Sequence, residues 1–364
     1  MRPILRHKKK PLIILAIFVL AASYFLFNDI NTVDPKKSEC LHASVEDKFD
    51  CLKTVLDKFV ENEDVGGAIA YLYYYQRLDD NLGAEDCHFL AHYVGDEAYR
   101  LYRKGYELDF GDEAQVCNHG YYHSFMTETI LSGEGERASE FCEALVAKQP
   151  GVSEACYHGI GHGAIFAIAE NTNVSLETAL TEGINMCEKI LGKESGRKLI
   201  DCVKGVYGGL ADTINLEEAV KNYPDKQSFY ELCFDVQDAY KEICYEEVAV
   251  ITYPVNPNSF SEVIEKAMSD SRLGEGRISL VGGLAVVYAS NIGEALSDEI
   301  EVCKSLPVEY KDACLLGMVS ALYWNEPDSS RDRKAEAFCK KEVLSEEERN
   351  MCFDFLKKER EMGR

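Results

Sequence analysis

The stretch Cys117-Asn-His-Gly-Tyr-Tyr-His123 contains a phrase that the chain repeats, a cysteine followed three positions later by a glycine. The first copies begin roughly 40 residues apart, the length of a helical hairpin in repeat proteins. The repeat predicts an all-α fold of stacked helical hairpins, arranged as a solenoid or a toroid. The other copies are Cys156-Tyr-His-Gly-Ile-Gly-His162, Cys202-Val-Lys-Gly-Val-Tyr-Gly208 and Cys314-Leu-Leu-Gly-Met-Val-Ser320.

The glycine of the phrase points to close packing of helices. Glycine in a helix interior costs about 1 kcal/mol relative to alanine, so its return at one slot needs a structural reason. We expect it to let neighbouring helices approach closely. The stretch Leu280-Val-Gly-Gly-Leu is a degenerate copy that lacks the cysteine, and the glycines of the full copies are Gly120, Gly159, Gly205 and Gly317.

The fourteen cysteines fall into seven couples along the sequence. Because an even and abundant set of cysteines is typical of oxidising compartments, we expect disulfides that tie one helix of a hairpin to the start of the next. Each short loop closed in this way could contribute roughly 3 kcal/mol of stability. Six couples span 11 to 15 positions and one is wider: Cys40 with Cys51, Cys142 with Cys156, Cys187 with Cys202, Cys233 with Cys244, Cys303 with Cys314, and Cys339 with Cys352, while Cys87 with Cys117 is the wide couple.

The hairpin arrangement resembles tetratricopeptide and Sel1-like repeats. The likeness concerns architecture alone, because the tryptophan-leucine-glycine-tyrosine signature of the tetratricopeptide repeat is missing and the hairpins vary in length. It therefore assigns a function to no residue of this chain.

The N-terminus has the pattern of a membrane anchor. Residues 1–10 are basic, and residues 11–28 form an uncharged, mostly apolar run. As a helix, this run is roughly 27 Å long, close to the thickness of a hydrocarbon core, and the basic side stays in the cytoplasm. We expect a cytoplasmic segment at 1–10, a single transmembrane signal anchor at 11–28, a linker at 29–39 and an extracytoplasmic helical domain at 40–364.

A cleaved signal peptide is the alternative to the anchor. The small residues of Ala21-Ala22-Ser23 suit cleavage, whereas the apolar run continues past them through Tyr24-Phe25-Leu26-Phe27 and favours retention. Both interpretations place the cysteines outside the cytoplasm, where they can be oxidised.

The formal net charge of the chain is -24. Binding to nucleic acid requires basic side chains that replace the counterions of phosphates, and the sequence contains no such basic stripe. We therefore expect no nucleic-acid partner. A protein partner on the helical-repeat surface remains open.

Six of the eight histidines form three pairs of identical spacing. Imidazoles four residues apart on a helix project from one face and can chelate one ion, so three such helices in neighbouring repeats predict a shared metal site. The histidine-bearing half covers about 40–175, and the half without pairs covers about 176–364. The predicted ligands are His88, His92, His119, His123, His158 and His162.

Two other interpretations of the histidines are a hydrogen-bonded or pH-sensing core and a repeat filler without function. Filler is disfavoured because the same slots hold Lys204 and Gly208 in one copy and Leu316 and Ser320 in another. Histidine is therefore not required to fold a hairpin, and metal binding is the favoured hypothesis.

Neutral nitrogen ligands favour zinc or copper, with iron as a third candidate. Asp96 continues the stripe of His88 and His92, so we expect it to ligate the ion or to orient an imidazole, while Tyr122 and Tyr157 could donate hydrogen bonds to a bound group. A hydrolase or an oxygenase is compatible with this ligand set, although no residue is marked as catalytic. The alternative from another class is an interaction scaffold in which the histidines are structural.

Overall fold

The computed structural model describes residues 40–78, 84–106, 108, 114, 117, 119–169, 174–213, 229–255, 260–292, 296–324 and 331–362. The chain divides into two compact units, Met1–Leu52 and Lys53–Arg364. The predicted cytoplasmic segment, anchor and linker lie outside the described residues. Among the helices that are described, none has the length and apolar character to cross a bilayer.

The described part of the chain is all-helical and contains no strand, as the repeat predicted. Among the described residues, the 3-10 helices η3 (Pro150–Val152), η4 (Phe229–Cys233) and η5 (Ser271–Leu273) precede α-helices. The α-helices are α2 (Val45–Glu61), α3 (Val65–Leu78), α4 (Ala84–Arg103), α5 (Gly120–Leu131), α6 (Gly135–Lys148), α7 (Ser153–Ala169), α8 (Leu176–Leu191), α9 (Arg197–Thr213), α11 (Asp238–Glu247), α12 (Ala249–Val255), α13 (Phe260–Ser269), α14 (Gly276–Ile292), α15 (Ser297–Lys304), α16 (Val308–Trp324), α17 (Arg331–Cys339) and α18 (Glu346–Met362).

Helix α8 illustrates how the local sequence sets a hairpin. The Ser175 hydroxyl accepts a hydrogen bond from the Thr178 N–H at 3.3 Å and caps the helix start, and Gly192, with φ 85°, ends it. Between these ends, Leu180, Ile184 and Cys187 recur at helical intervals and are buried. The apolar stripe thus faces α7 and α9, against which α8 packs.

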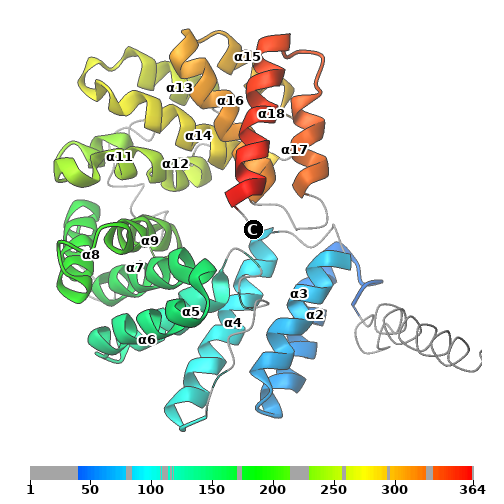
Figure 1. Cartoon of the computed structure of the whole chain (residues 1–364), viewed down its shortest axis with the longest axis vertical. Coiled ribbons are helices and arrows are strands. Elements are labelled where there is room, and N and C mark those ends of the chain that lie inside the picture. Colours follow the sequence, from blue (N-terminus) through cyan, green and yellow to red (C-terminus); the bar gives the residue numbers. More distant parts are fainter. Residues whose placement is uncertain are drawn as a thin grey trace, which may run out of the picture. The chain divides into compact units, whose positions relative to one another are not determined.

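Helices α5, α7 and α9, which carry three copies of the repeated phrase, pack against one another in chain order. In order along the chain, α4 contacts α5, α5 contacts α7, and α7 contacts α9, while α14 forms the same kind of contact with α11 and α16 (Figure 1). We call α4, α5, α7 and α9 the central row. The helices between them, such as α6 and α8, cover its sides.

Glycine makes the contacts of the central row close. A Cβ atom at Gly205 of α9 would overlap the carbonyl oxygen of His158, and one at Gly161 of α7 would overlap that of Cys202. Likewise, a Cβ at Gly159 would lie 2.7 Å from the carbonyl oxygen of Tyr122 on α5. The expectation that the recurring glycines permit close helix contact is therefore confirmed in these copies.

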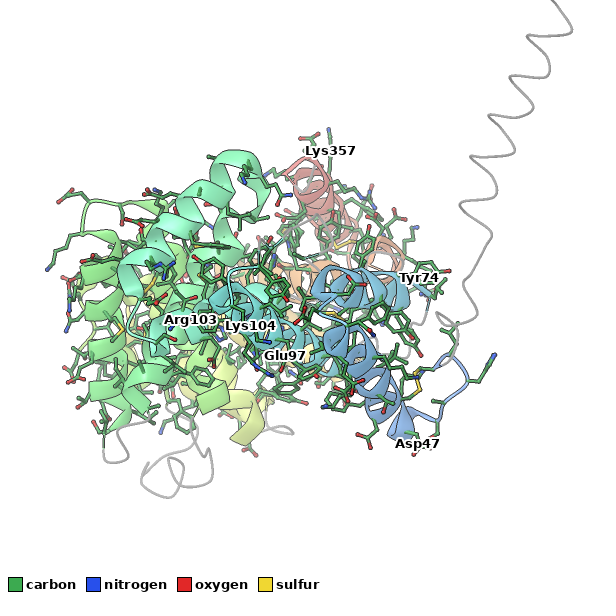
Figure 2. The ribbon with its side chains drawn as sticks, turned by 90° about the horizontal axis from the view of Figure 1, so that it is seen from below. Asp47, Tyr74, Glu97, Arg103, Lys104 and Lys357 are labelled. Atoms are coloured by element: carbon green, nitrogen blue, oxygen red, sulfur yellow. A yellow bond between two sulfur atoms is a disulfide. The ribbon has the colours of Figure 1, made fainter. Side chains whose placement is uncertain are left out.

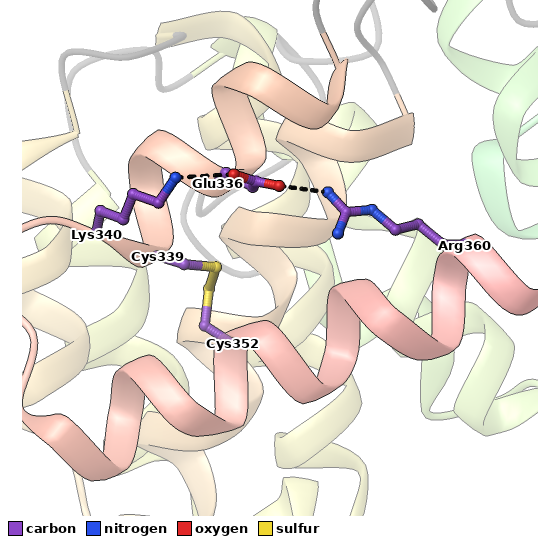
Figure 3. Close-up of a disulfide and its surroundings, with 5 residues drawn as sticks. All are labelled: Glu336, Cys339, Lys340, Cys352 and Arg360. Atoms are coloured by element: carbon purple, nitrogen blue, oxygen red, sulfur yellow. Dashed lines mark hydrogen bonds and ion pairs between the residues drawn. A yellow bond between two sulfur atoms is a disulfide. The ribbon is translucent and has the colours of Figure 1, made fainter.

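All seven expected cysteine couples are disulfide-bonded, and the described cysteines include no free thiol. Several join a helix to the first turns of the next one, as Cys142 of α6 does with Cys156 of α7. Figure 3 shows this arrangement between Cys339 of α17 and Cys352 of α18. Beside it, the Glu336 carboxylate accepts hydrogen bonds from Lys340 and Arg360, each at 2.8 Å, and adds an ion pair between the same two helices.

Three bridges depart from the expected link between two helices of a hairpin. Cys87 of α4 is bonded to Cys117, which lies in a turn before α5. Cys40 lies in a turn before α2 and is bonded to Cys51 within that helix, with Cα atoms 5.7 Å apart. Cys233 ends the 3-10 helix η4 and is bonded to Cys244 of α11, with Cα atoms 5.6 Å apart. The expectation of helix-to-helix links is therefore wrong for these three couples. A disulfide requires a suitable Cα separation and Cβ atoms that point toward each other, which a turn or a 3-10 helix can provide as well as an α-helix does.

We predict that replacing Cys187 and Cys202 together by alanine lowers the free energy of unfolding by roughly 3 kcal/mol, because the bridge closes a loop of 15 residues in the unfolded chain. Denaturant unfolding of the purified oxidised protein measures the change. An unchanged midpoint, with the other bridges intact by mass spectrometry, would contradict this role.

Candidate metal centre

The close contact between α4 and α5 brings the first three imidazoles of the site together. His88 and His92 lie one turn apart on α4, with ring centroids 4.4 Å apart. Gly120 is the first residue of α5 and lies against the carbonyl oxygen of His88, which is only 2.6 Å from where a Cβ of residue 120 would be. His123, one turn into α5, therefore lies against both α4 rings, at centroid distances of 5.1 Å from His88 and 5.7 Å from His92.

Helix α7 supplies two more imidazoles from the other side of α5. His158 and His162 lie one turn apart, and their Nε2 atoms are 3.1 Å from each other. The ring of His123 stacks on both, with centroids 4.9 Å from His158 and 4.4 Å from His162. Five imidazoles from three helices of the central row thus share one interior region.

The five imidazoles form two overlapping triads. His88, His92 and His123 make the first, and His123, His158 and His162 the second, each with ligand atoms within 4.8 Å of one another. His123 belongs to both, and His123 and His162 keep only 6% and 3% exposure. Both groups could hold a metal ion, and in the described part of the chain neither contains a carboxylate or a cysteine.

His119 departs from the prediction that each histidine pair shares one helical face. It precedes α5 rather than belonging to it, with the left-handed backbone angles φ 64° and ψ 14°. The helix cannot start earlier, because Cys117 is also left-handed, with φ 57°, and is bonded to Cys87 of α4. His119 is consequently in neither triad. Burial brings its pKa to about 4, and the charge of His88 acts in the same direction.

Hydrogen bonding leaves ring nitrogens available for an ion. The Nδ1 atom of His88 lies 2.9 Å from the carbonyl oxygen of Cys117, so it donates its N–H there and Nε2 keeps the lone pair. The Nε2 atom of His92 and the Nδ1 atom of His123 are buried without a hydrogen-bond partner. A buried polar atom left unpaired costs roughly 1–3 kcal/mol, a cost that a metal–nitrogen bond removes.

Burial keeps the imidazoles neutral. It is the largest cause of the lowered pKa of His92, His123 and His162, and the charges of neighbouring histidines act in the same direction. The pKa of His92 falls to about 3, as does that of His158. Neutral imidazole is the protonation state that ligates a transition metal, so no proton has to leave these rings before an ion binds at neutral pH.

The geometry is close to what one ion needs. With zinc–nitrogen bonds of about 2.0–2.1 Å, two ligand nitrogens on a tetrahedral ion lie roughly 3.3 Å apart. The 3.1 Å separation of the His158 and His162 Nε2 atoms nearly meets this requirement. The ligand nitrogen of His123 lies within 4.8 Å of both, so its ring, which stacks on the other two, has to turn before all three nitrogens bind one ion.

The other predicted site residues have different neighbours. Asp96 accepts a hydrogen bond from the Ser124 hydroxyl and is in neither triad, and burial raises the pKa of its carboxyl. Tyr122 is fully buried on α5, and the ring of Tyr157 lies beneath the Lys198 ammonium at 5.4 Å. Their part in orienting an imidazole or a bound group stays a prediction.

Sequence reasoning did not identify Gly208 of α9 as part of the site. A Cβ atom at this position would lie 3.2 Å from the Nε2 atom of His158 and 3.2 Å from that of His162. The signal was present in the aligned phrases, because Gly208 occupies the slot of His123 and His162. From the sequence, this glycine indicated only that a hairpin folds without histidine at that slot. The contact between Gly208 and the two imidazoles of α7 cannot be seen in the sequence.

One turn earlier on α9, Lys204 occupies the slot of His158 in the aligned phrases. Its ammonium lies 3.5 Å from a carboxylate oxygen of Glu246 and 3.5 Å from one of Glu247, both on α11. Burial raises the pKa of Glu247 to about 7, although Lys204 acts in the opposite direction. This ion-pair group joins the central row to α11.

A shallow polar cleft of about 360 Å³ lies between α2 and α4. Its Asp57 carboxylate accepts a hydrogen bond from the Tyr93 hydroxyl at 2.6 Å, and Arg100 pairs with Glu97. Glu97 and Lys104 line it, and Figure 2 shows both on the same side of the molecule. Because two of its carboxylates, Asp57 and Glu97, are held by Lys53 and Arg100, we assign the cleft no ligand.

Compared with protein-family models, curated proteins and solved structures, the chain matches none of them. The site is therefore interpreted from its own geometry.

We predict that the wild-type protein loses stability between pH 5 and pH 8, and that the variant Glu247→Gln does not show this loss. The folded protein holds the Glu247 proton up to about pH 7, whereas the unfolded chain releases it near the ordinary value of 4.5, so rising pH favours unfolding across this window. Denaturant unfolding at both pH values measures the effect. Glu246→Gln, at the more exposed partner of Lys204, is the comparison variant and should weaken the pH dependence without removing it, because burial, the largest cause of the raised pKa of Glu247, remains.

Proposed function

We propose that this chain is a membrane-anchored, extracytoplasmic protein that binds a transition-metal ion through the imidazoles of His88, His92, His123, His158 and His162. The observation that carries the proposal is the convergence of these five side chains from three separate helices on one buried region. Packing alone does not account for it, because the corresponding slots of α9 and α16 contain no histidine.

The second triad is the stronger binding position. Its two α7 nitrogens already lie at nearly the separation that one ion imposes, and a ring nitrogen of His123 lies within 4.8 Å of both. The first triad shares His123, so the two positions depend on the same side chain. His123 is therefore the residue on which metal binding depends most.

Neutral imidazoles support zinc or copper as the bound ion, with iron as the third candidate. Calcium and magnesium are disfavoured, because they require oxygen ligands and neither triad contains a carboxylate.

The proposed location rests on chemistry rather than on the described helices. Seven disulfides are typical of a compartment that permits oxidation. The basic residues of segment 1–10 followed by the apolar run 11–28 support an anchor with a cytoplasmic N-terminus. The helical domain would then face the outside of the cell membrane.

The test is elemental analysis of the oxidised full-length protein after exchange into metal-free buffer and loading with zinc. We predict at least one tightly bound equivalent in the wild type and its loss in His123→Ala, because that variant breaks both triads. His119→Ala is the matched control: it removes a neighbouring imidazole that is in neither triad, and the protein should keep its metal.

A folded wild-type protein without stoichiometric metal would overturn the proposal and favour the interaction scaffold, in which the histidines are structural. Equal metal content in the His123→Ala and wild-type proteins would also overturn it, because the ion would then lie elsewhere.

A further inference from the structure

His123 belongs to both triads, and this sharing limits how many ions the centre holds. An imidazole ring that keeps its N–H has one nitrogen lone pair, so it ligates one ion at a time. Two divalent ions on neighbouring triads would also repel each other strongly, because neither triad contains a carboxylate in the described part of the chain. The two triads are therefore alternative positions of a single ion.

The ring of His123 is oriented differently toward the two helices. It meets the α4 rings of His88 and His92 edge-on, with interplanar angles of 67° and 84°. On the other side it stacks on the α7 rings of His158 and His162, with angles of 25° and 20°. Because the lone pair of an imidazole nitrogen lies in the plane of its ring, stacked rings do not direct their lone pairs at one point. The second triad therefore forms around an ion only after His123 turns.

The α7 pair, His158 and His162, is covered on the side of α9. A Cβ atom at Gly208 would lie 3.2 Å from both Nε2 atoms, so the backbone of α9 lies close against these nitrogens. The two helices are held together beside them, because a Cβ at Gly205 would overlap the carbonyl oxygen of His158. His162 is only 3% exposed, and although His158 keeps some exposure, its Nε2 atom lies 3.1 Å from that of His162. The α9 side thus leaves no approach for an ion to these two nitrogens.

The α4 pair, His88 and His92, lies nearer the surface. Both residues are part-exposed, whereas His123 is 6% exposed. Phe89 follows His88 on the same helix, and its ring meets both α4 imidazoles edge-on with centroids 6.4 Å from each. Since Phe89 is itself 45% exposed, the first triad borders the surface of the protein at this side chain.

We propose that a single transition-metal ion is captured at the first triad and passes to the second triad when His123 turns. This inference rests on the proposed metal binding and deepens it, because it gives the two triads consecutive roles. The α4 pair captures the ion, and the α7 pair retains it. During the passage the ion exchanges the α4 nitrogens for the α7 nitrogens while His123 stays bound, so no proton or electron is transferred.

The test mixes the metal-free, oxidised full-length protein with cobalt(II) and follows visible absorption by stopped flow. The absorption of cobalt(II) depends on its ligands, so capture and passage give separate signals. We predict two phases in the wild type. The rate of the first rises in proportion to the cobalt concentration, and the rate of the second is independent of it. A titration to saturation should end at one bound equivalent per chain.

Two variants separate the two steps. In His92→Ala, capture should be at least about tenfold slower, because the first triad has lost a ligand, while the final spectrum and affinity stay those of the wild type. In His162→Ala, capture should keep the wild-type rate, the second phase should disappear, and cobalt should be bound at least about tenfold more weakly.

His119→Ala is the matched control. It removes a neighbouring imidazole that is in neither triad, so both phases should remain. Near-ultraviolet circular dichroism of all four proteins checks that they are folded. The two phases and the single equivalent are measured on the wild type, so the test does not depend on the folding of a variant.

The outcomes separate the two proposals. Absence of bound cobalt from the wild type contradicts the proposed function itself. Two bound equivalents in the wild type overturn only the passage of a single ion, and so does binding in one concentration-dependent phase. Capture by a folded His92→Ala protein at the wild-type rate overturns it as well, because the ion would then enter elsewhere.

Discussion

Backbone contact between the glycines of the central row is the constraint on which the rest of the structure depends. Ordinary helix pairs keep their axes roughly 8–10 Å apart, because side chains lie between them. At Gly120, Gly159 and Gly205 the neighbouring helix presents its carbonyl oxygen where a Cβ would be. Helices that approach this closely bring the residues one turn further along into contact, and in α5 and α7 those residues are histidines.

This arrangement explains why the site is buried and yet polar. A cluster of imidazoles with unpaired nitrogens, such as Nε2 of His92 and Nδ1 of His123, is costly in a helical interior without a ligand. The disulfides supply stability that does not depend on the core, and Cys87–Cys117 ties α4 to the start of α5 beside His88. The Cys117 carbonyl then sets the tautomer of that imidazole. The Cys87–Cys117 disulfide thus both stabilises the fold and orients a histidine of the site.

Much of the fold was predictable from the sequence because its signals are local. Cysteine spacing predicted the partners of all seven bridges, and the recurring glycine indicated close helix packing. The convergence of histidines was also predictable, because His88/His92 and His158/His162 lie on helices of neighbouring repeats. The expected anchor at 11–28 lies outside the described residues and stays a prediction.

The missed features depend on three-dimensional contacts. His119 follows the histidine spacing but lies in a left-handed turn, which the bridge at Cys117 and the close approach of Gly120 impose. That His123 serves both triads could not be read from spacing, because it depends on α5 lying between α4 and α7. In the sequence, Gly208 is only a position at which the repeat lacks a histidine. Its contact with His158 and His162 depends on the packing of α9 against α7.

The central claim is that imidazole nitrogens, and not the cysteines, hold a metal ion in this chain. X-ray absorption spectroscopy of the zinc-loaded full-length protein measures the neighbours of the ion directly. The structure predicts nitrogen or oxygen neighbours at about 2.0–2.1 Å with the outer-shell pattern of imidazole. Sulfur neighbours at about 2.3 Å, or a nearest shell without imidazole, would contradict it.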